Sequence, residues 1–129
     1  MNETTEIDAL KSVLNGFKKS GKIPLAYLYG SYATKTQHKR SDIDLAIYIN
    51  TDDNEEVISI IDTILMAVER PVEILRLDDE EESPFIIQEA LKGIPLIEPD
   101  TETLYMVADR ALHDTEDIRY RRTIASGKL

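Results

Sequence analysis

Apolar residues recur along this chain with two periods, one typical of helices and the other of strands. Around residues 7–17 and 57–68 they lie three or four positions apart, as in a helix that buries one face. Short runs rich in β-branched and aromatic residues at 25–29, 43–49 and 72–77 predict strands. The alternation of helices and strands predicts the α/β (α+β) class, with a small mixed sheet packed by helices.

Residues that begin and end helices agree with this order. Gly21 follows the first helix as a stop signal, and residues 51–54 can cap the helix that runs to residue 68. The last predicted helix, at 103–124, is long and carries an apolar stripe. We therefore expect a long C-terminal helix after the sheet.

A shorter helix and a strand are predicted between the third strand and the last helix. Ser83 supplies an N-cap and Pro84 a first-turn proline for a helix at 85–92. Gly93 ends that helix before a strand at 94–97. Both elements are expected to serve as scaffold.

The composition predicts a single domain over residues 1–129. An apolar content of 42% is enough for one core, and 129 residues leave no room for a second domain. No apolar run is long enough to cross a bilayer, and residues 1–6 carry acids where a signal peptide needs a basic start. The chain has no cysteine, which excludes disulfides and thiolate metal sites. We therefore expect a cytoplasmic protein without membrane contact.

The charge balance restricts the partners of this chain. Its net charge is −10, whereas nucleic-acid binding relies on a basic surface that displaces counterions. Direct contact with nucleic acid is therefore not expected, and a protein partner is expected to be basic.

Two aspartates at the start of the second predicted strand suggest a metal site. Asp42 and Asp44 are two positions apart, so a strand directs both carboxylates to one side and Ile43 to the other, into the core. Adjacent carboxylates repel unless they share a cation or a proton. Mg²⁺ prefers hard oxygen ligands and completes its shell with water and substrate phosphates. Such a pair on a strand can also be a solvated surface, but its context favours Mg²⁺.

That context is a glycine and a serine located ten residues before the aspartates. Gly30 ends the first strand and lets the backbone approach a ligand. Ser31 offers a hydroxyl and a backbone N–H at what we predict to be the first turn of a helix, which is a natural anion site. Together with Asp42 and Asp44, these residues predict a site for a nucleotide and its metal.

The third predicted strand contributes one carboxylate. Glu73 lies in an otherwise apolar run, where a charged group needs a partner, and beside the aspartates it would be the third ligand of a site with one or two metals. It would face water if the strand lay at an edge. Asp78 and Asp79 are alternative ligands, but they begin an acidic run at 78–82 that is typical of a solvated loop.

Three cations lie between the glycine-serine pair and the aspartates. Lys35, Lys39 and Arg40 would neutralise part of the charge of a triphosphate. Lysines in loops also serve solubility alone, so these residues are candidates for phosphate contacts.

The segment 29–31, followed by ten residues and then 42–45, resembles the signature of the minimal nucleotidyltransferases of the polymerase-beta-like superfamily. Residues 71–75 and 85–97 resemble that family's third catalytic strand and the helix and strand after it. The small size is similar to the family's MntA-type antitoxins. The resemblance implies the nucleotidyltransferase fold, Mg²⁺, and transfer of AMP from ATP to a tyrosine of a partner HEPN-domain toxin.

The chain departs from the family pattern at two places. The family usually has aspartate where this chain has Glu73, and a basic residue followed by glycine where it has Thr34 and Lys35. These departures favour an alternative in which the chain kept the fold, lost the chemistry and acts by binding its partner. A nucleotidyltransferase for a small molecule is a second alternative, although such relatives generally need an added domain to hold the acceptor.

Overall fold

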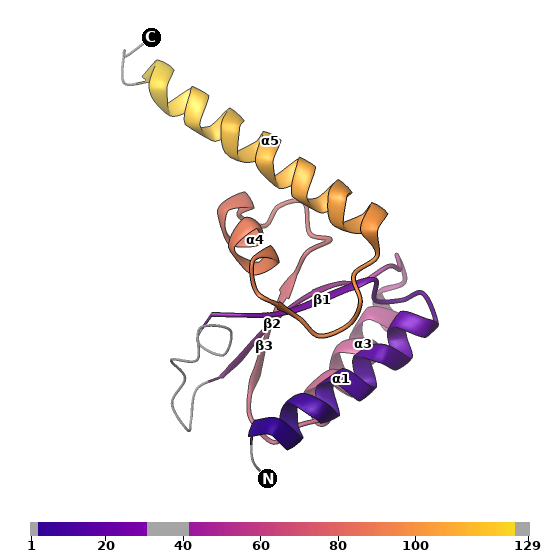
Figure 1. Ribbon diagram of the computed structural model, residues 1–129. Coiled ribbons are helices and arrows are strands. Elements are labelled where there is room, and N and C mark those ends of the chain that lie inside the picture. Colours follow the sequence, from indigo (N-terminus) through magenta and orange to yellow (C-terminus); the bar gives the residue numbers. More distant parts are fainter. Residues whose placement is uncertain (1–2, 31–41, 126–129) are drawn as a thin grey trace.

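The computed structural model describes residues 3–30 and 42–125. In chain order, the elements in Figure 1 are α1 (Glu3–Lys19), β1 (Leu25–Tyr29), β2 (Ile43–Tyr48), α3 (Asn54–Met66), β3 (Val72–Arg76), α4 (Pro84–Leu91), β4 (Ile94–Pro95) and α5 (Thr101–Ala125).

The sheet is mixed and has the strand order β3-β2-β1-β4. β1 pairs antiparallel with both β2 and β4, whereas β2 pairs parallel with β3. The parallel pair requires a crossover, which α3 provides. The starts of β2 and β3 therefore lie next to the end of β1, on the side of the sheet where β1 ends.

Two apolar cores lie on opposite faces of this sheet. The core beneath α1 and α3 includes Leu10, Leu14, Ile43, Leu45, Ile47, Ile60 and Ile64. The core beneath α4 and α5 includes Leu25, Tyr27, Ala46, Leu75, Ile87, Ala90, Val107 and Ala111. The molecule consequently has three layers, with the sheet between two helical layers (Figure 1).

The predicted class, the small mixed sheet and the long C-terminal helix are confirmed. Asp53 caps α3 as expected, since its Oδ1 accepts a hydrogen bond from the Glu55 N–H at 3.0 Å. Ser83 makes no side-chain cap, although Pro84 does lie in the first turn of α4. β4 is shorter than the predicted 94–97, although the Leu96 N–H still donates a hydrogen bond to the Ala26 carbonyl at 2.9 Å. Pro95 is tolerated in β4 because this strand lies at the sheet's edge.

Gly93 lies where α4 passes into β4, and its backbone packs directly against β1. A Cβ atom added there would overlap the Leu28 carbonyl oxygen and lie 3.1 Å from the Ala90 carbonyl oxygen. Because backbone atoms cannot swing away, Gly93→Ala is expected to lower the free energy of unfolding by about 2 kcal/mol, as measured by urea unfolding. Gly16→Ala is the matched control, since an added Cβ meets nothing within 4 Å there and alanine favours the helix. Equal stability of the two variants would contradict this packing.

Candidate functional site

Three residues form one row across β1, β2 and β3, on the side of the sheet where β1 ends. Tyr29 of β1 pairs with Asp44 of β2, and Asp44 pairs with Glu73 of β3. Neighbours of Asp44 and Glu73 along their strands, such as Ile43 and Ile74, pack into the α1–α3 core. Since side chains alternate along strands, both carboxylates lie on the opposite face, the one that α4 and α5 cover.

The carboxyl groups of Asp44 and Glu73 interact directly. The pKa of Asp44 is raised above its ordinary value, first because the group is partly buried, then by the charge of Glu73 and a side-chain hydrogen bond with it, and then by the charge of Asp42. The row therefore brings together residues 29 positions apart in sequence. In the absence of a cation, the Asp44 carboxyl group keeps its proton to a higher pH than an ordinary aspartate does.

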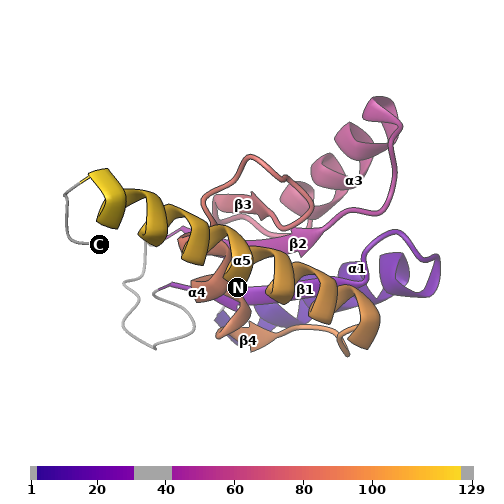
Figure 2. The same ribbon diagram turned by 90° about the horizontal axis from the view of Figure 1, so that it is seen from above.

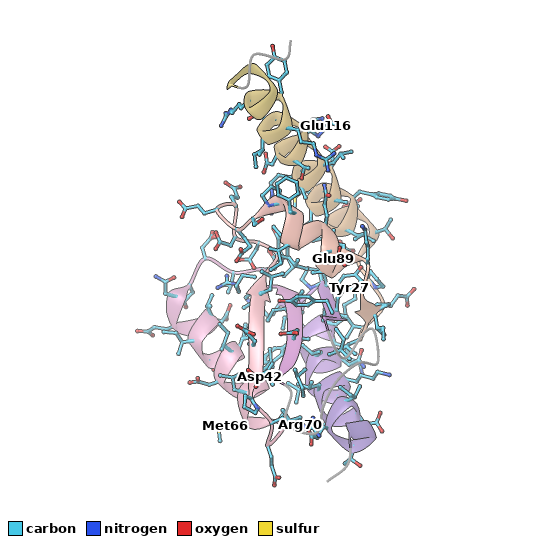
Figure 3. The ribbon with its side chains drawn as sticks, turned by 90° about the vertical axis from the view of Figure 1, so that its left-hand side faces the viewer. Tyr27, Asp42, Met66, Arg70, Glu89 and Glu116 are labelled. Atoms are coloured by element: carbon cyan, nitrogen blue, oxygen red, sulfur yellow. The ribbon has the colours of Figure 1, made fainter. Side chains whose placement is uncertain are left out.

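Asp42 is exposed and directly precedes β2. Figure 3 views the molecule from this edge and labels Asp42 there. Within residues 3–30 and 42–125, no group of three or more acidic or histidine side chains is arranged to hold a metal ion. Two adjoining carboxylates still suit Mg²⁺, which commonly takes one or two protein carboxylates and fills its shell with water and phosphate oxygens. The donor set thus fits a hard cation, with Asp42 available as a further ligand.

Gly30 ends β1 in the left-handed region, with φ of 67°. A Cβ atom added at this position would overlap the Asp44 carboxylate. The chain therefore needs glycine here both for its backbone conformation and for the position of Asp44.

Gly30→Ala is expected to displace Asp44 and to lower the free energy of unfolding by about 1 to 2 kcal/mol. Gly21→Ala is the matched control, because Gly21 has a similar φ of 79° but an added Cβ meets nothing within 4 Å. We expect both variants to lose stability in thermal unfolding, and only Gly30→Ala to lose the rise in unfolding midpoint that added Mg²⁺ should cause. An equal response of the two variants to Mg²⁺ would show that the close approach to Asp44 has no functional role.

The structure brings two further residues to the pair that the sequence analysis did not include. The pKa of Tyr29 is raised by burial and then by the charges of Asp44, Glu73 and Glu82, so its hydroxyl lies near these carboxylates. Glu82 comes from the loop between β3 and α4. In the sequence, the position of Tyr29 directly before Gly30 could have indicated that it lies at the site. Glu82 could not be recognised in this way, because it belongs to an acidic run that is typical of a solvated loop.

The other predicted site residues divide into two groups. Ser31, Lys35, Lys39 and Arg40, together with the helix predicted at Ser31, lie outside the described residues and stay predictions. Asp78 has a structural role instead, because its Oδ1 accepts hydrogen bonds from the Ile49 N–H at 3.1 Å and from Arg76 Nε at 3.0 Å. Asp79 accepts a hydrogen bond from the Glu81 N–H at 2.9 Å. Neither residue is placed as a ligand beside Asp44.

A family model described as "Polymerase beta, Nucleotidyltransferase" matches residues 11–102, which include Asp42, Asp44 and Glu73. No curated protein sequence matches this chain.

No helix among the described residues has the length and apolar character that a membrane crossing needs.

Solved structures with this fold include toxin–antitoxin complexes. A toxin–antitoxin crystallised with AMP-PNP is 21% identical, with a TM-score of 0.67 over 91% of this chain and 95% of the other. A mutant of the toxin–antitoxin MntA–HpeT is 22% identical, with a TM-score of 0.65 over 98% and 97%. A chain from the tri-AMPylated Shewanella oneidensis HEPN toxin in complex with MNT antitoxin is 18% identical, with a TM-score of 0.62 over 94% and 96%. The nucleotidyltransferase fold that the sequence resemblance implied is confirmed.

Proposed function

Because this chain belongs to the polymerase beta nucleotidyltransferase family, we propose that it is an antitoxin that transfers AMP from ATP to a tyrosine of a HEPN-domain toxin. The observation that carries this proposal is the contact between the carboxyl groups of Asp44 and Glu73 on adjacent parallel strands. Fold likeness to an MNT antitoxin in complex with a tri-AMPylated HEPN toxin supports the choice of partner and group transferred.

In the proposed reaction, the acceptor tyrosine oxygen attacks the α-phosphorus of ATP. The new bond joins that oxygen to the α-phosphorus, while the bond from this phosphorus to the oxygen bridging to the β-phosphate breaks. Pyrophosphate leaves with the bonding electron pair, and AMP stays on the tyrosine. Positioning and charge neutralisation supply most of the acceleration in such phosphoryl chemistry.

The carboxylates have separate roles in this proposal. Asp42 and Asp44 would hold the nucleotide's cation, and Glu73 would complete the site and accept the proton that the acceptor hydroxyl releases. One or two Mg²⁺ ions, when bound, would neutralise charge on the phosphates. The pairing of Asp44 with Glu73 fixes its position, and Gly30 leaves room for its carboxylate because it has no side chain.

The residues between Gly30 and Asp42 would hold the phosphates. Gly30 lets the backbone come close to the nucleotide, and Ser31 donates hydrogen bonds to phosphate oxygens from its hydroxyl and N–H. Lys35, Lys39 and Arg40 offset the charge of the triphosphate and of the leaving pyrophosphate.

A second candidate function is neutralisation of the toxin by binding alone. It is favoured by the absence of a three-carboxylate metal group among the described residues and by glutamate at position 73. A chain of this kind would form a stable complex without modifying its partner.

The test is to mix the purified chain with a HEPN-domain toxin, Mg²⁺ and ATP labelled at the α-phosphate, and to measure label on the toxin. Label that depends on Mg²⁺ and is absent when the toxin's tyrosines are replaced by phenylalanine is the expected result. ATP labelled at the γ-phosphate should leave the toxin unlabelled, because the β- and γ-phosphates leave together. A stable complex without label would select the binding-only function and overturn the transferase.

A further inference from the structure

The outward face of α5 carries exposed apolar side chains that no element of the described structure covers. Its inward face packs on α4 and the sheet through the following residues: Leu104, Val107, Ala111 and Thr115. At 100° per residue, positions 105, 106, 112 and 120 fall on the other side of the helix. The exposed fractions are 69% for Tyr105, 48% for Met106, 50% for Leu112 and 56% for Tyr120.

The centre of this face is a shallow, open surface formed by side chains of α5 alone. It includes the following residues: Tyr105, Met106, Ala108, Asp109 and Leu112. A contiguous apolar patch rimmed by polar residues is typical of a protein-interaction site. We call the side chains of Tyr105, Met106 and Leu112, with Glu102, Asp109 and Glu116 around them, the α5 patch.

The charge of the α5 patch is negative. Glu102, Asp109, Asp114, Glu116 and Asp117 are exposed, whereas Arg110, Arg119 and Arg121 are the arginines between residues 101 and 121, where there is no lysine. His113 is also exposed, and it lies 3.4 Å from a carboxylate oxygen of Asp109. Even with His113 protonated, the acids outnumber it.

Arg110, Arg119 and Arg121 of α5 each have a partner outside the α5 patch. Arg110 donates a hydrogen bond to the Leu77 carbonyl at 2.9 Å, and Arg119 lies over the Phe85 ring at 5.9 Å. Arg121 forms an ion pair with Asp117 at 2.9 Å. Arg110 and Arg119 are thus directed toward the body, and Arg121 pairs with an acid of α5 itself, so the acids of the α5 patch have no arginine partner among these contacts.

The position of α5 links the patch to the carboxylate pair. In both Figure 1 and Figure 2, α5 runs in the same general direction as β1 and extends past the edge where β1 ends. Figure 3, viewed from that edge, shows Glu116 on the part of α5 above the body. A protein bound along α5 would therefore reach beyond the same edge at which Asp44 and Glu73 lie.

We propose that the α5 patch is the docking surface for the acceptor protein, and that it binds a basic helical surface with apolar side chains between its lysines and arginines. This inference rests on the proposed function for the identity of the partner. Charge complementarity selects this occupant over a second copy, because two copies with a net charge of −10 each would place acid against acid. The apolar side chains supply affinity, and the acidic rim accelerates association.

The test compares the affinity of three variants for a HEPN-domain toxin, measured by fluorescence anisotropy. The first variant is Tyr105→Ser/Met106→Ser/Leu112→Ser, for which we expect a Kd raised about thirtyfold or more. The second is Glu102→Lys/Asp109→Lys/Glu116→Lys, for which we expect about a tenfold weaker complex with reduced salt dependence. The matched control is Ile58→Ser/Leu65→Ser/Met66→Ser on α3, which removes three exposed apolar side chains and should leave the Kd unchanged. Circular dichroism melts establish that each variant is folded.

The possible outcomes separate this inference from the proposed function. Wild-type affinity in both α5 variants, or equal weakening by the α3 control, would overturn the docking surface, whereas label on the toxin from wild type would leave the transferase standing. Weakened binding by the α5 variants without label from wild type would support the surface and overturn the transferase. A concentration-dependent dimer in sedimentation that Leu112→Ser abolishes would assign the patch to a second copy and overturn the proposal. A wild-type chain that binds no HEPN-domain toxin would overturn both.

Discussion

Asp44→Asn is expected to abolish nucleotidyl transfer while leaving the chain folded. Asparagine keeps the size of the side chain and can hydrogen-bond to Glu73, but it cannot supply the charge that a cation needs. We expect transfer of labelled AMP to fall by about two orders of magnitude or more, since a metal's charge stabilisation is worth several kcal/mol. The measurement is initial-rate labelling of the toxin at saturating ATP.

The same variant is expected to be at least as stable as wild type without Mg²⁺. The folded-state pKa of Asp44 is raised, so the unfolded chain loses this proton first as the pH increases. Stability of wild type should therefore decline between the ordinary aspartate pKa and the raised folded pKa, and Asp44→Asn should lack that part of the decline. Urea unfolding in EDTA from pH 3 to 8 measures both curves.

Added Mg²⁺ provides the control for the metal's part in this result. It should raise the thermal unfolding midpoint of wild type, because a ligand that binds only the folded state stabilises it. The midpoint of Asp44→Asn should respond less. An unfolded variant, or undiminished transfer by a folded one, would contradict the role of Asp44.

Arg70→Met is expected to cause the largest loss of stability of any single change considered. Arg70 Nε lies 3.4 Å from an Oε2 atom of Glu6 in α1, and the Glu6 side chain is only 5% exposed. That oxygen accepts no hydrogen bond within the described structure, so the arginine's positive charge is its compensation. Removing one partner of a buried pair leaves an uncompensated charge, and we expect the free energy of unfolding to fall by about 3 kcal/mol.

Two controls isolate the buried charge as the cause. The double variant Glu6→Gln/Arg70→Met removes both charges and should recover part of the lost stability. Lys22→Met breaks the exposed pair with Glu56, where the side chains are 38% and 36% exposed, and should cost less than about 1 kcal/mol. If Arg70→Met costs no more than Lys22→Met in urea unfolding, the pair with Glu6 is not stabilising.

The elements of the fold could be predicted because each follows from a local pattern. The run at 25–29 coincides with β1, and the strands predicted at 43–49 and 72–77 each end one residue earlier in the structure. Period-two alternation also placed Ile43 in the core and set Asp44 on the opposite face, because strand geometry leaves no other arrangement. Gly21 was recognised as the stop of α1, and it adopts a φ of 79°.

The contacts between distant elements could not be predicted in this way. Strand order and register arise from packing of whole faces, so the pairing of Asp44 with Glu73 follows from the parallel docking of β2 and β3. The burial of Glu6 against Arg70 and the approach of Gly93 to Leu28 likewise depend on residues far apart in sequence. The sequence by itself determined which residues form helices and strands and that Asp44 lies on the face opposite Ile43, because these depend on neighbours along the chain. The sequence also suggested Glu73 as the carboxylate beside Asp44, but only the tertiary structure decided that these two groups meet, because strand register is set by burial over the whole sheet.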